Sequence, residues 1–324
     1  MNVSIDQQLP VKIVMVTYNQ ERYIVQAIES VLRQNTDFNY RLVIGDDCST
    51  DSTADICEEY AKAYPEKISL IKTYRNMGLL ANYKQVMDAF PAQYIAILEG
   101  DDYWIDDNKL QTQYNLLQEK PEIGLVHTNC DLLFESGKIQ IGSHQRHARS
   151  IKNGIVFDQL LTENYIRPVT VMFRSELYTK YVEIDEYIKL GFKTLDYPMW
   201  LDIAPNSRFY YLNYSTAVYR IHGISISNSN LYEKQAEFFK SIYEIKNYAM
   251  EKYNPQHIHR KSIINSCLVD QIVIDMEFRK YDKVFESAKS IEILDLKSRI
   301  ICIVSKNKIL MDLLVYYLNY RKKL

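Results

Sequence analysis

Short apolar runs alternate with amphipathic stretches over residues 11–98, and this alternation limits the possible folds more than any other feature. The apolar runs, which have the length of strands, cover 11–16, 40–44, 68–71 and 94–98. The stretches with apolar residues at helical spacing cover 24–32, 54–61 and 79–90. Strand and helix in alternation are typical of a parallel sheet covered by helices on both faces. We therefore predict an α/β fold, and a further strand at 168–174.

Polar residues follow the predicted strands at the point where each strand ends. Thr17 to Asn19 follow the first, Asp46 and Asp47 follow the second, and Glu99, Asp101 and Asp102 follow the fourth. The carboxyl ends of parallel strands share one edge of a sheet, where ligands bind. Three carboxylates so close together need a cation or an exposed position. A divalent ion that joins them to substrate phosphates explains the cluster, and an acidic loop that caps the next helix also explains it.

The overall composition and the missing motifs exclude several classes of protein. A net charge of −2 argues against a nucleic-acid partner. The five cysteines are scattered without CxxC spacing, as in a protein of the reducing cytosol. No Gly-x-Gly-x-x-Gly follows the first strand and no Walker motif is present, which excludes dinucleotide-binding and P-loop proteins. We find neither a signal peptide nor an apolar run of membrane-spanning length.

Four short motifs together resemble family-2 glycosyltransferases of the GT-A fold. They read Val14-Met15-Val16-Thr17-Tyr18-Asn19, Asp46-Asp47-Cys48-Ser49-Thr50-Asp51, Arg75-Asn76-Met77-Gly78 and Leu98-Glu99-Gly100-Asp101-Asp102-Tyr103-Trp104. Each motif alone is weak, but the four occur in the family's order and spacing. The resemblance implies a GT-A, Rossmann-like, mostly parallel sheet and an inverting transfer from a nucleotide-activated sugar, with Mn²⁺ or Mg²⁺ as cofactor. It also implies a role in bacterial surface-polysaccharide assembly.

The resemblance assigns the nucleotide sugar to residues at the ends of the first strands. Asp46 and Asp47 are expected to face the base or ribose, because a carboxylate accepts hydrogen bonds from a uracil N–H or from ribose hydroxyls. Arg75 and Asn76 are expected near the nucleotide or diphosphate. The remaining residues expected to border the donor are Thr17, Tyr18, Asn19, Glu21, Glu99, Gly100 and Asp101.

The family's Asp-x-Asp metal motif reads Glu99-Gly100-Asp101 in this chain. We expect Asp101 and Asp102 to bind the metal, while the longer Glu99 side chain reaches either the ion, a metal-bound water or the ribose. The segment Tyr219-Arg220-Ile221-His222 resembles the Tyr-Arg-x-His-x-x-Ser-x-Ser element of many members, where Ser225 and Ser227 complete the pattern. His222 is therefore either a further metal ligand, a diphosphate contact or a histidine that orders this loop.

The segment Phe192 to Leu201 resembles the family's catalytic segment, in which an acidic pair precedes an aromatic-rich helix. Leu195 stands at the first acidic position, so Asp196 is the candidate general base. An N-terminal helix cap is the alternative role for Asp196. Trp104 and Arg220 are candidate contacts of the acceptor or of phosphate.

Helical periodicity dominates after residue 230. We predict a catalytic domain at 1–230, with a nucleotide-sugar half at 1–104 and an acceptor half at 105–230, and a helical extension at 231–324. Between Lys297 and Leu324 there are seven Lys or Arg residues and one Asp. Such an apolar, basic end can bind an anionic membrane surface or form a homodimer or packing helix.

We predict a metal-dependent inverting hexosyl- or N-acetylhexosaminyl-transferase. The donor is a nucleotide diphosphate sugar, with UDP as the expected nucleotide, and the acceptor is a lipid-linked saccharide or another glycan. The expected location is the cytoplasm, on the cytoplasmic face of the membrane. The alternatives are a nucleotide-sugar binder without turnover, suggested by Glu99 and Leu195, and a nucleotidyltransferase, although Thr17 to Gln20 offer no glycine-rich phosphate loop.

Overall fold

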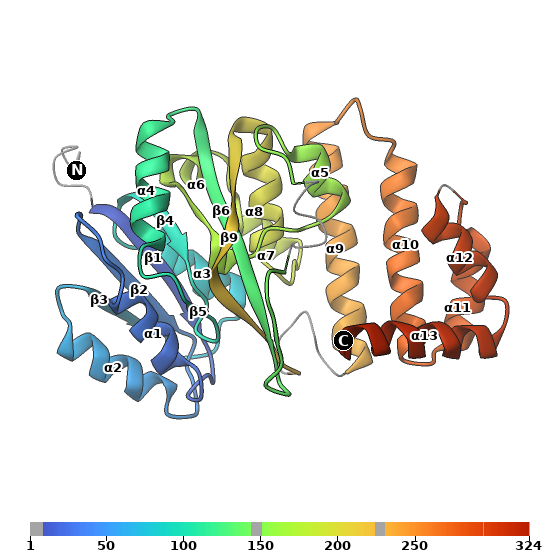
Figure 1. Cartoon of the computed structure of the whole chain (residues 1–324), viewed down its shortest axis with the longest axis horizontal. Helices are drawn as coiled ribbons and strands as arrows, with labels where there is room; N and C mark the ends of the chain where they lie inside the picture. The colour runs from blue at the N-terminus through green and yellow to red at the C-terminus, as the bar shows by residue number, and fades with distance from the viewer. Residues whose placement is uncertain (1–8, 144–150, 224–230, 294, 324) are drawn as a thin grey trace. The chain divides into compact units, whose positions relative to one another are not determined.

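The computed structural model describes residues 9–143, 151–223, 231–293 and 295–323, with side chains up to residue 318 in the last segment. Ser225 and Ser227 of the predicted motif, and the predicted domain boundary at 230, lie outside these residues. The chain divides into two compact units, unit 1 at residues 1–222 and unit 2 at residues 223–324 (Figure 1).

The first part of unit 1 alternates strictly between strand and helix, as the sequence predicts. Its elements are β1 (Leu9–Thr17), α1 (Ile24–Leu32), β2 (Tyr40–Asp46), α2 (Thr53–Ala63), β3 (Ile68–Lys72), α3 (Leu79–Asp88) and β4 (Ala92–Ile97). The four strands lie in the order β3-β2-β1-β4, and each neighbouring pair is parallel. The predicted α/β fold is confirmed, and this half of the sheet is its parallel part.

The second part of unit 1 completes a mixed sheet. Its elements are β5 (Tyr103–Trp104), α4 (Lys109–Glu119), β6 (Ile123–Phe134), β7 (Ile139–Gln140), α5 (Phe157–Thr162), η2 (Pro168–Thr170), β8 (Met172–Arg174), α6 (Ser175–Tyr181), α7 (Ile184–Lys189), α8 (Asp196–Ile203), η3 (Ala204–Asn206) and β9 (Arg208–Ile221). The strand order continues β4-β8-β6-β9-β5. β8 is antiparallel to both of its neighbours, and β9 runs parallel to β6.

The strand predicted at 168–174 is wrong in its first half. Residues Pro168–Thr170 form a 3₁₀ turn, and only Met172–Arg174 form the strand β8. Proline fixes φ and has no N–H to donate to a sheet, which favours a turn at this position. The Thr170 amide and hydroxyl both donate to the Arg167 carbonyl, at 3.0 and 2.7 Å, and close that turn.

The core of unit 1 explains why its first strands are continuous apolar runs. Helices cover a parallel sheet on both faces, so both faces of each strand are buried. Residues 11–17 of β1 are all buried, and α1 turns Ile24, Ala27, Ile28 and Val31 toward the same core. The polar ends of these strands therefore meet at the rim of a rigid sheet.

Unit 2 consists of helices. They are α9 (Tyr232–Tyr253), α10 (Arg260–Glu277), α11 (Tyr281–Ser287), η5 (Ala288–Ser290), α12 (Leu296–Val304) and α13 (Lys308–Lys323). A capping box starts α12, because Asp295 accepts from the Ser298 amide and the Ser298 hydroxyl lies 3.0 Å from the Asp295 amide. Over the described part of the chain, every helix is too short or too polar to cross a bilayer.

Candidate functional site

The ends of β1, β2 and β4 converge as the sequence predicts. Thr17 and Asp46 are paired in register at the ends of β1 and β2, and the Asp47 amide donates to the Thr17 carbonyl at 3.0 Å. The Gly100 amide, just past β4, donates to the Val16 carbonyl at 3.1 Å. A Cβ at Gly100 would lie 2.5 Å from Gln20 Oε1 and 2.9 Å from the Thr17 hydroxyl, so a larger residue would displace these side chains. Residues from three sequence motifs thus form one edge.

Glu99, Asp101 and Asp102 form a compact carboxylate cluster at this edge. Each offers one oxygen, and these oxygens lie within 4.8 Å of one another. The Tyr83 hydroxyl of α3 donates to Glu99 at 2.8 Å. Burial, together with the charges of Asp101 and Asp196, raises the pKa of Glu99 to about 8, although the hydrogen bond from Tyr83 partly opposes this rise. The protein's own groups therefore do not fully compensate negative charge on this cluster.

Asp102 is the most deeply buried member of the cluster, with 1% of its surface exposed. One of its oxygens accepts from the Arg220 amide at 2.8 Å. Its second oxygen, Oδ2, is buried without a hydrogen-bond partner among the described residues. Burial and the charges of Asp101 and Glu99 raise the pKa of Asp102 well above its usual range. Clustered hard oxygen donors with an unsatisfied oxygen fit a divalent cation such as Mn²⁺ or Mg²⁺.

His222 lies against the cluster. Its Nε2 is 2.9 Å from Asp101 Oδ2, and its ring stacks on Tyr23 with centroids 5.4 Å apart. The imidazole is therefore held within reach of the carboxylates, although His222 follows β9, more than a hundred residues further along the chain. This position suits an additional metal ligand and equally suits a side chain that orients Asp101.

The Arg220 guanidinium packs against two aromatic rings and donates to two protein acceptors. It lies between the rings of Tyr23 and Tyr103, 4.9 and 4.6 Å from their centroids. It donates hydrogen bonds to the Asp101 carbonyl and to Gln26 of α1. These contacts bind β9 to the loop after β4. Gln26 and Tyr23 were not predicted as site residues, since neither belongs to a motif and their roles depend only on the tertiary fold.

Asp46 and Asp47 are neighbours in the sequence, but their carboxylate oxygens have different hydrogen-bond partners. Both Asp47 oxygens are engaged by backbone amides, from Met77 at 2.7 Å and from Gly78 at 2.8 Å. Asp46 accepts from the Ser49 amide through Oδ2 at 3.1 Å, and its buried Oδ1 has no hydrogen-bond partner among the described residues. Asp47 therefore anchors the loop before α3, whereas Asp46 retains an acceptor for a further donor.

Asn19 and Glu21 join the loop after β1 to the loop after β2. Asn19 adopts φ +53° and its side-chain oxygen accepts from the Thr50 amide at 2.8 Å. Glu21 accepts from the Ser52 amide at 2.9 Å. Tyr18 is exposed beside them. These contacts hold the outer wall of the sheet edge in place.

The loop that precedes α3 carries the third motif. Asn76 donates to the Asp47 carbonyl at 3.2 Å, so it is part of the anchored loop. The neighbouring Arg75 is exposed, and within the described segments it forms no ion pair. A cationic side chain that is free beside a carboxylate-lined edge is available to an anionic ligand.

Asp196 is the first residue of α8, and the residue before it, Leu195, is the helix N-cap. Asn164 donates to one oxygen of Asp196 at 3.0 Å, and the Thr194 hydroxyl donates to the other. Asp196 is half-buried and close enough for its charge to raise the pKa of Glu99. Asp196 therefore lies within electrostatic range of Glu99, although it is not a member of the carboxylate cluster.

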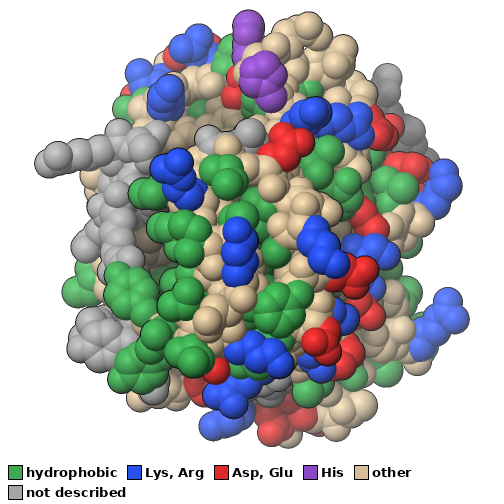
Figure 2. All heavy atoms as spheres, turned by 90° about the vertical axis from the view of Figure 1, so that its right-hand side faces the viewer, with side chains coloured by type: hydrophobic (Ala, Val, Ile, Leu, Met, Phe, Trp, Pro, Cys, Tyr) green, Lys and Arg blue, Asp and Glu red, His purple; other side chains and the backbone are tan. Residues whose placement is uncertain are grey.

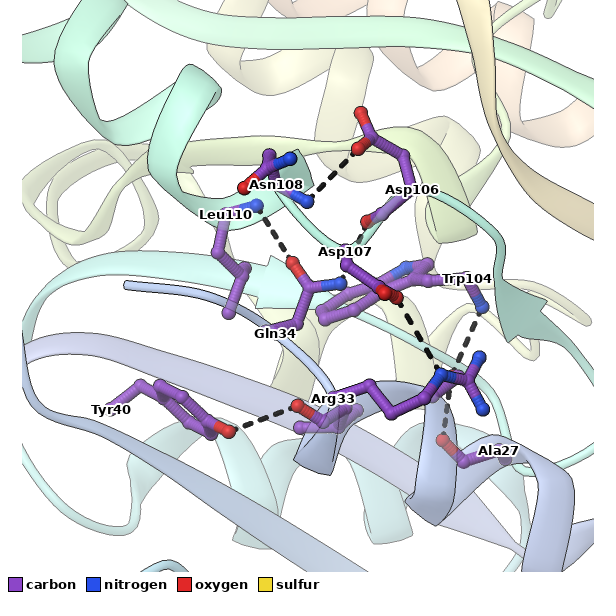
Figure 3. Close-up of polar contacts among 11 residues, drawn as sticks. Ala27, Arg33, Gln34, Tyr40, Trp104, Asp106, Asp107, Asn108 and Leu110 are labelled. Atoms are coloured by element: carbon purple, nitrogen blue, oxygen red, sulfur yellow. Dashed lines mark hydrogen bonds and ion pairs between the residues drawn. The ribbon is translucent and has the colours of Figure 1, made fainter. Parts of the chain in front are cut away.

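Trp104 is a core residue, which corrects its expected contact with acceptor or phosphate. Its side chain is fully buried, its indole N–H donates to the Val169 carbonyl at 2.9 Å, and its ring has no surface to offer an acceptor. Figure 3 shows how the surrounding segment is fixed. There Gln34, just after α1, donates to the Asp106 carbonyl at 2.8 Å and accepts from the Leu110 amide at 3.0 Å.

The fold and its edge define an α/β protein with a candidate nucleotide and divalent-metal site. A family model described as "Glycosyl transferase family 2" matches residues 12–174, half of the chain, and the chain belongs to this family. An uncharacterized protein of Mycobacterium tuberculosis is 31% identical over 229 residues, which are 71% of this chain and 63% of that protein. The chain thus spans less than two thirds of this relative's length.

Further relatives and solved structures agree with the family and the fold. The putative teichuronic acid biosynthesis glycosyltransferase TuaG of Bacillus subtilis is 27% identical, over 68% of this chain and 82% of TuaG. S. aureus TarS 1–349, solved with UDP-GlcNAc, has a TM-score of 0.59 at 16% identity, covering 92% of both chains. The mannosyltransferase PcManGT of Pyrobaculum calidifontis, solved with GDP-Man and Mn²⁺, has a TM-score of 0.55 at 13% identity, covering 94% of this chain and 86% of that one. These similarities establish the GT-A type of α/β fold.

Proposed function

We propose that the protein is an inverting glycosyltransferase that moves a sugar from a nucleotide diphosphate sugar to an acceptor hydroxyl. The observation that carries the proposal is the carboxylate cluster of Glu99, Asp101 and Asp102 at the sheet edge, with Asp196 close by. The catalytic domain lies at 1–230, with the nucleotide sugar bound by 1–104 and the acceptor by 105–230. Residues 231–324 form the helical extension.

The nucleotide lies along the ends of β1 and β2, where Thr17, Tyr18, Asn19 and Glu21 form the wall. The buried, unpartnered oxygen of Asp46 accepts a hydrogen bond from the base or ribose. A uracil N–H is a suitable donor, and the UDP-GlcNAc complex of TarS, a protein of the same fold, supports a UDP-sugar. Asp47 acts on the same ligand through the Met77–Gly78 loop that it holds.

The diphosphate lies over the carboxylate cluster. Asp101 and Asp102, with His222 beside them, would hold a divalent cation that neutralises charge on the diphosphate leaving group. The donor set and the unpartnered Asp102 oxygen support this assignment, and Mn²⁺ in the PcManGT structure agrees with it. Glu99 is fixed by Tyr83, which suits an orienting role or contact with the ribose. Exposed Arg75, with Asn76 beside it, supplies the cationic contact to the phosphates.

Asp196 is the general base. It removes the proton of the acceptor hydroxyl, and that oxygen bonds to the anomeric carbon while the bond from this carbon to the diphosphate oxygen breaks. The attack comes from the face opposite the leaving group and inverts the anomeric centre. Asn164 and Thr194 hold the carboxylate in one orientation for this step. The acceptor is a glycan or lipid-linked saccharide of surface-polysaccharide assembly, met at the cytoplasmic face of the membrane.

Substitution of Asp196 by Asn tests the proposal. Asn keeps the shape and the contact to Asn164 or Thr194 but cannot take up a proton, so turnover should fall by about a hundredfold or more. Turnover is measured as nucleotide release with Mn²⁺ and donor saturating, after a thermal-shift screen of nucleotide sugars has identified the donor. Donor binding should be unchanged in the variant. Wild-type turnover by Asp196→Asn would contradict the assigned base, and donor binding without turnover in the wild type would identify a binding protein.

A further inference from the structure

Helices α12 and α13 of unit 2 are apolar on their outer faces as well as on their buried ones. Ile301 of α12 and Met311 of α13 are buried in the core of unit 2. Exposed side chains on the same two helices include Leu296, Ile300, Ile303, Ile309, Leu313 and Tyr316, which we name the outer apolar set. Leu296, Ile309 and Tyr316 are each at least 70% exposed. A solvated helix face is expected to be polar, so a set of this size marks a contact surface.

Basic side chains outnumber acidic ones within α12 and α13, although Asp295 precedes Leu296 and Asp270 of α10 pairs with Lys297. Residues 296–318 include four basic side chains and one acidic one, Asp312. Lys297 is paired with Asp270 at 2.6 Å, and Lys308 lies over the Tyr281 ring. Arg299 and Lys306 are exposed, and no ion pair involves them within the described residues. Figure 2 shows Lys and Arg side chains interspersed with hydrophobic side chains and with Asp and Glu on the face toward the viewer.

We propose that the outer faces of α12 and α13 bind an anionic lipid surface. Amphipathic helices with basic and apolar side chains lie in the plane of the membrane interface, and basic residues are attracted to anionic headgroups. Tyr316 has the amphipathic ring that is enriched at that interface. The charge bias argues against a second copy as the occupant, because a two-fold contact would place these like-charged faces against each other. The surface lies outside the family match at 12–174 and does not depend on the proposed reaction.

Flotation with vesicles of defined composition tests this proposal on the full-length protein. Vesicles of phosphatidylcholine alone are compared with vesicles that also contain phosphatidylglycerol. We expect binding only to the anionic vesicles and weaker binding as salt is added. The charge variant Arg299→Glu with Lys306→Glu should bind at least about thirtyfold more weakly, since each basic side chain near the surface contributes about fivefold. The apolar variant Ile303→Gln with Leu313→Gln should also bind more weakly.

Matched controls separate the surface from general charge and hydrophobicity. Lys261→Glu changes an exposed lysine of α10, and Ile155→Gln changes an exposed isoleucine of unit 1, so both should bind like the wild type. Equal melting temperatures show that the variants are folded. The proposal is overturned if the wild type ignores anionic vesicles at low salt, or if the charge and apolar variants bind as the wild type does. It is also overturned if the wild type binds no vesicles and light scattering shows a dimer that only the apolar variant dissociates.

Discussion

Arg220 connects three parts of the candidate site that are far apart in the sequence. Its backbone amide donates to one oxygen of Asp102, and its guanidinium donates to the Asp101 carbonyl and to Gln26 of α1. The Arg220 side chain is buried, and both of its terminal nitrogens donate to protein acceptors. We therefore regard Arg220 as a positioning residue, and Gln26 as the group that fixes its orientation.

Replacement of Gln26 by Ala should weaken metal binding without unfolding the protein. Gln26 acts on Asp101 only through Arg220, so its loss should reduce metal affinity by less than the roughly tenfold that is typical for a direct partner of a ligand. The affinity is measured by Mn²⁺ titration with electron paramagnetic resonance in the absence of donor, so the result does not depend on activity. Gln26→Glu keeps an oxygen acceptor for Arg220 and should retain the affinity. Unchanged Mn²⁺ affinity in a folded Gln26→Ala protein would refute the positioning role.

The two aspartates after β2 show where prediction from the sequence stops at this scale. The sequence places both at the sheet edge but treats them as equivalent. Only the folded loop 73–78 shows that each Asp47 oxygen accepts from a backbone amide, whereas Asp46 Oδ1 has no hydrogen-bond partner among the described residues. The carboxylate cluster was predictable because its residues follow one strand, whereas the contribution of Gln26 depends on a contact between α1 and β9.

At the level of elements, the first four strands were predictable because burial on both faces leaves them as continuous apolar runs. The remaining strands carry weaker local signals. β5 has two residues, and the fourteen residues of β9 lack a regular alternation, since Phe209 to Leu212 are all apolar or aromatic and Ser215 and Thr216 are both polar. The insertion of β8 antiparallel between β4 and β6 depends on pairing between distant segments, which periodicity cannot reveal.

Helix α4 begins with a lysine that has no exposed surface. Lys109 donates to Gln113 at 2.7 Å, one turn along the helix, and its ammonium lies 4.5 Å from the centroid of the Trp104 ring. Burial lowers the pKa of Lys109 from 10.5 to about 7, while the charge of Asp106 partly opposes this effect. The unfolded chain therefore binds more protons than the folded one between pH 7 and 10.5.

The free energy of unfolding should therefore rise with pH because of Lys109. Relative to Lys109→Met, the free energy of unfolding of the wild type should increase by about 2 kcal/mol between pH 7 and 9 and be constant below pH 6. Urea unfolding at several pH values measures the difference. Lys261→Met, at an exposed lysine, is the control and should follow the wild-type profile. If the difference in unfolding free energy between wild type and Lys109→Met does not change with pH, burial does not shift the pKa of Lys109.

At the scale of the whole molecule, the buried carboxylate cluster lowers the stability of the fold locally, and packing elsewhere compensates for this loss. Burial raises the pKa of both Glu99 and Asp102, which means that their charged forms are disfavoured at this position. The packed sheet and the contacts from Arg220 hold them together regardless. A ligand that binds this arrangement only in the folded state must stabilise the entire unit through linkage.

Mn²⁺ should therefore raise the melting temperature of the protein, by about 5 °C at a hundredfold excess over its dissociation constant. Asp102→Asn removes a buried charge but keeps an oxygen that can accept from the Arg220 amide. This variant should melt no lower than the wild type in EDTA and should lose most of the Mn²⁺-dependent rise. Differential scanning calorimetry with Mn²⁺, with Ca²⁺ and with EDTA distinguishes site binding from a general effect of cations. An equal Mn²⁺-dependent rise in wild type and Asp102→Asn would exclude Asp102 as a metal ligand, because a lost charged ligand must reduce the affinity for the folded state.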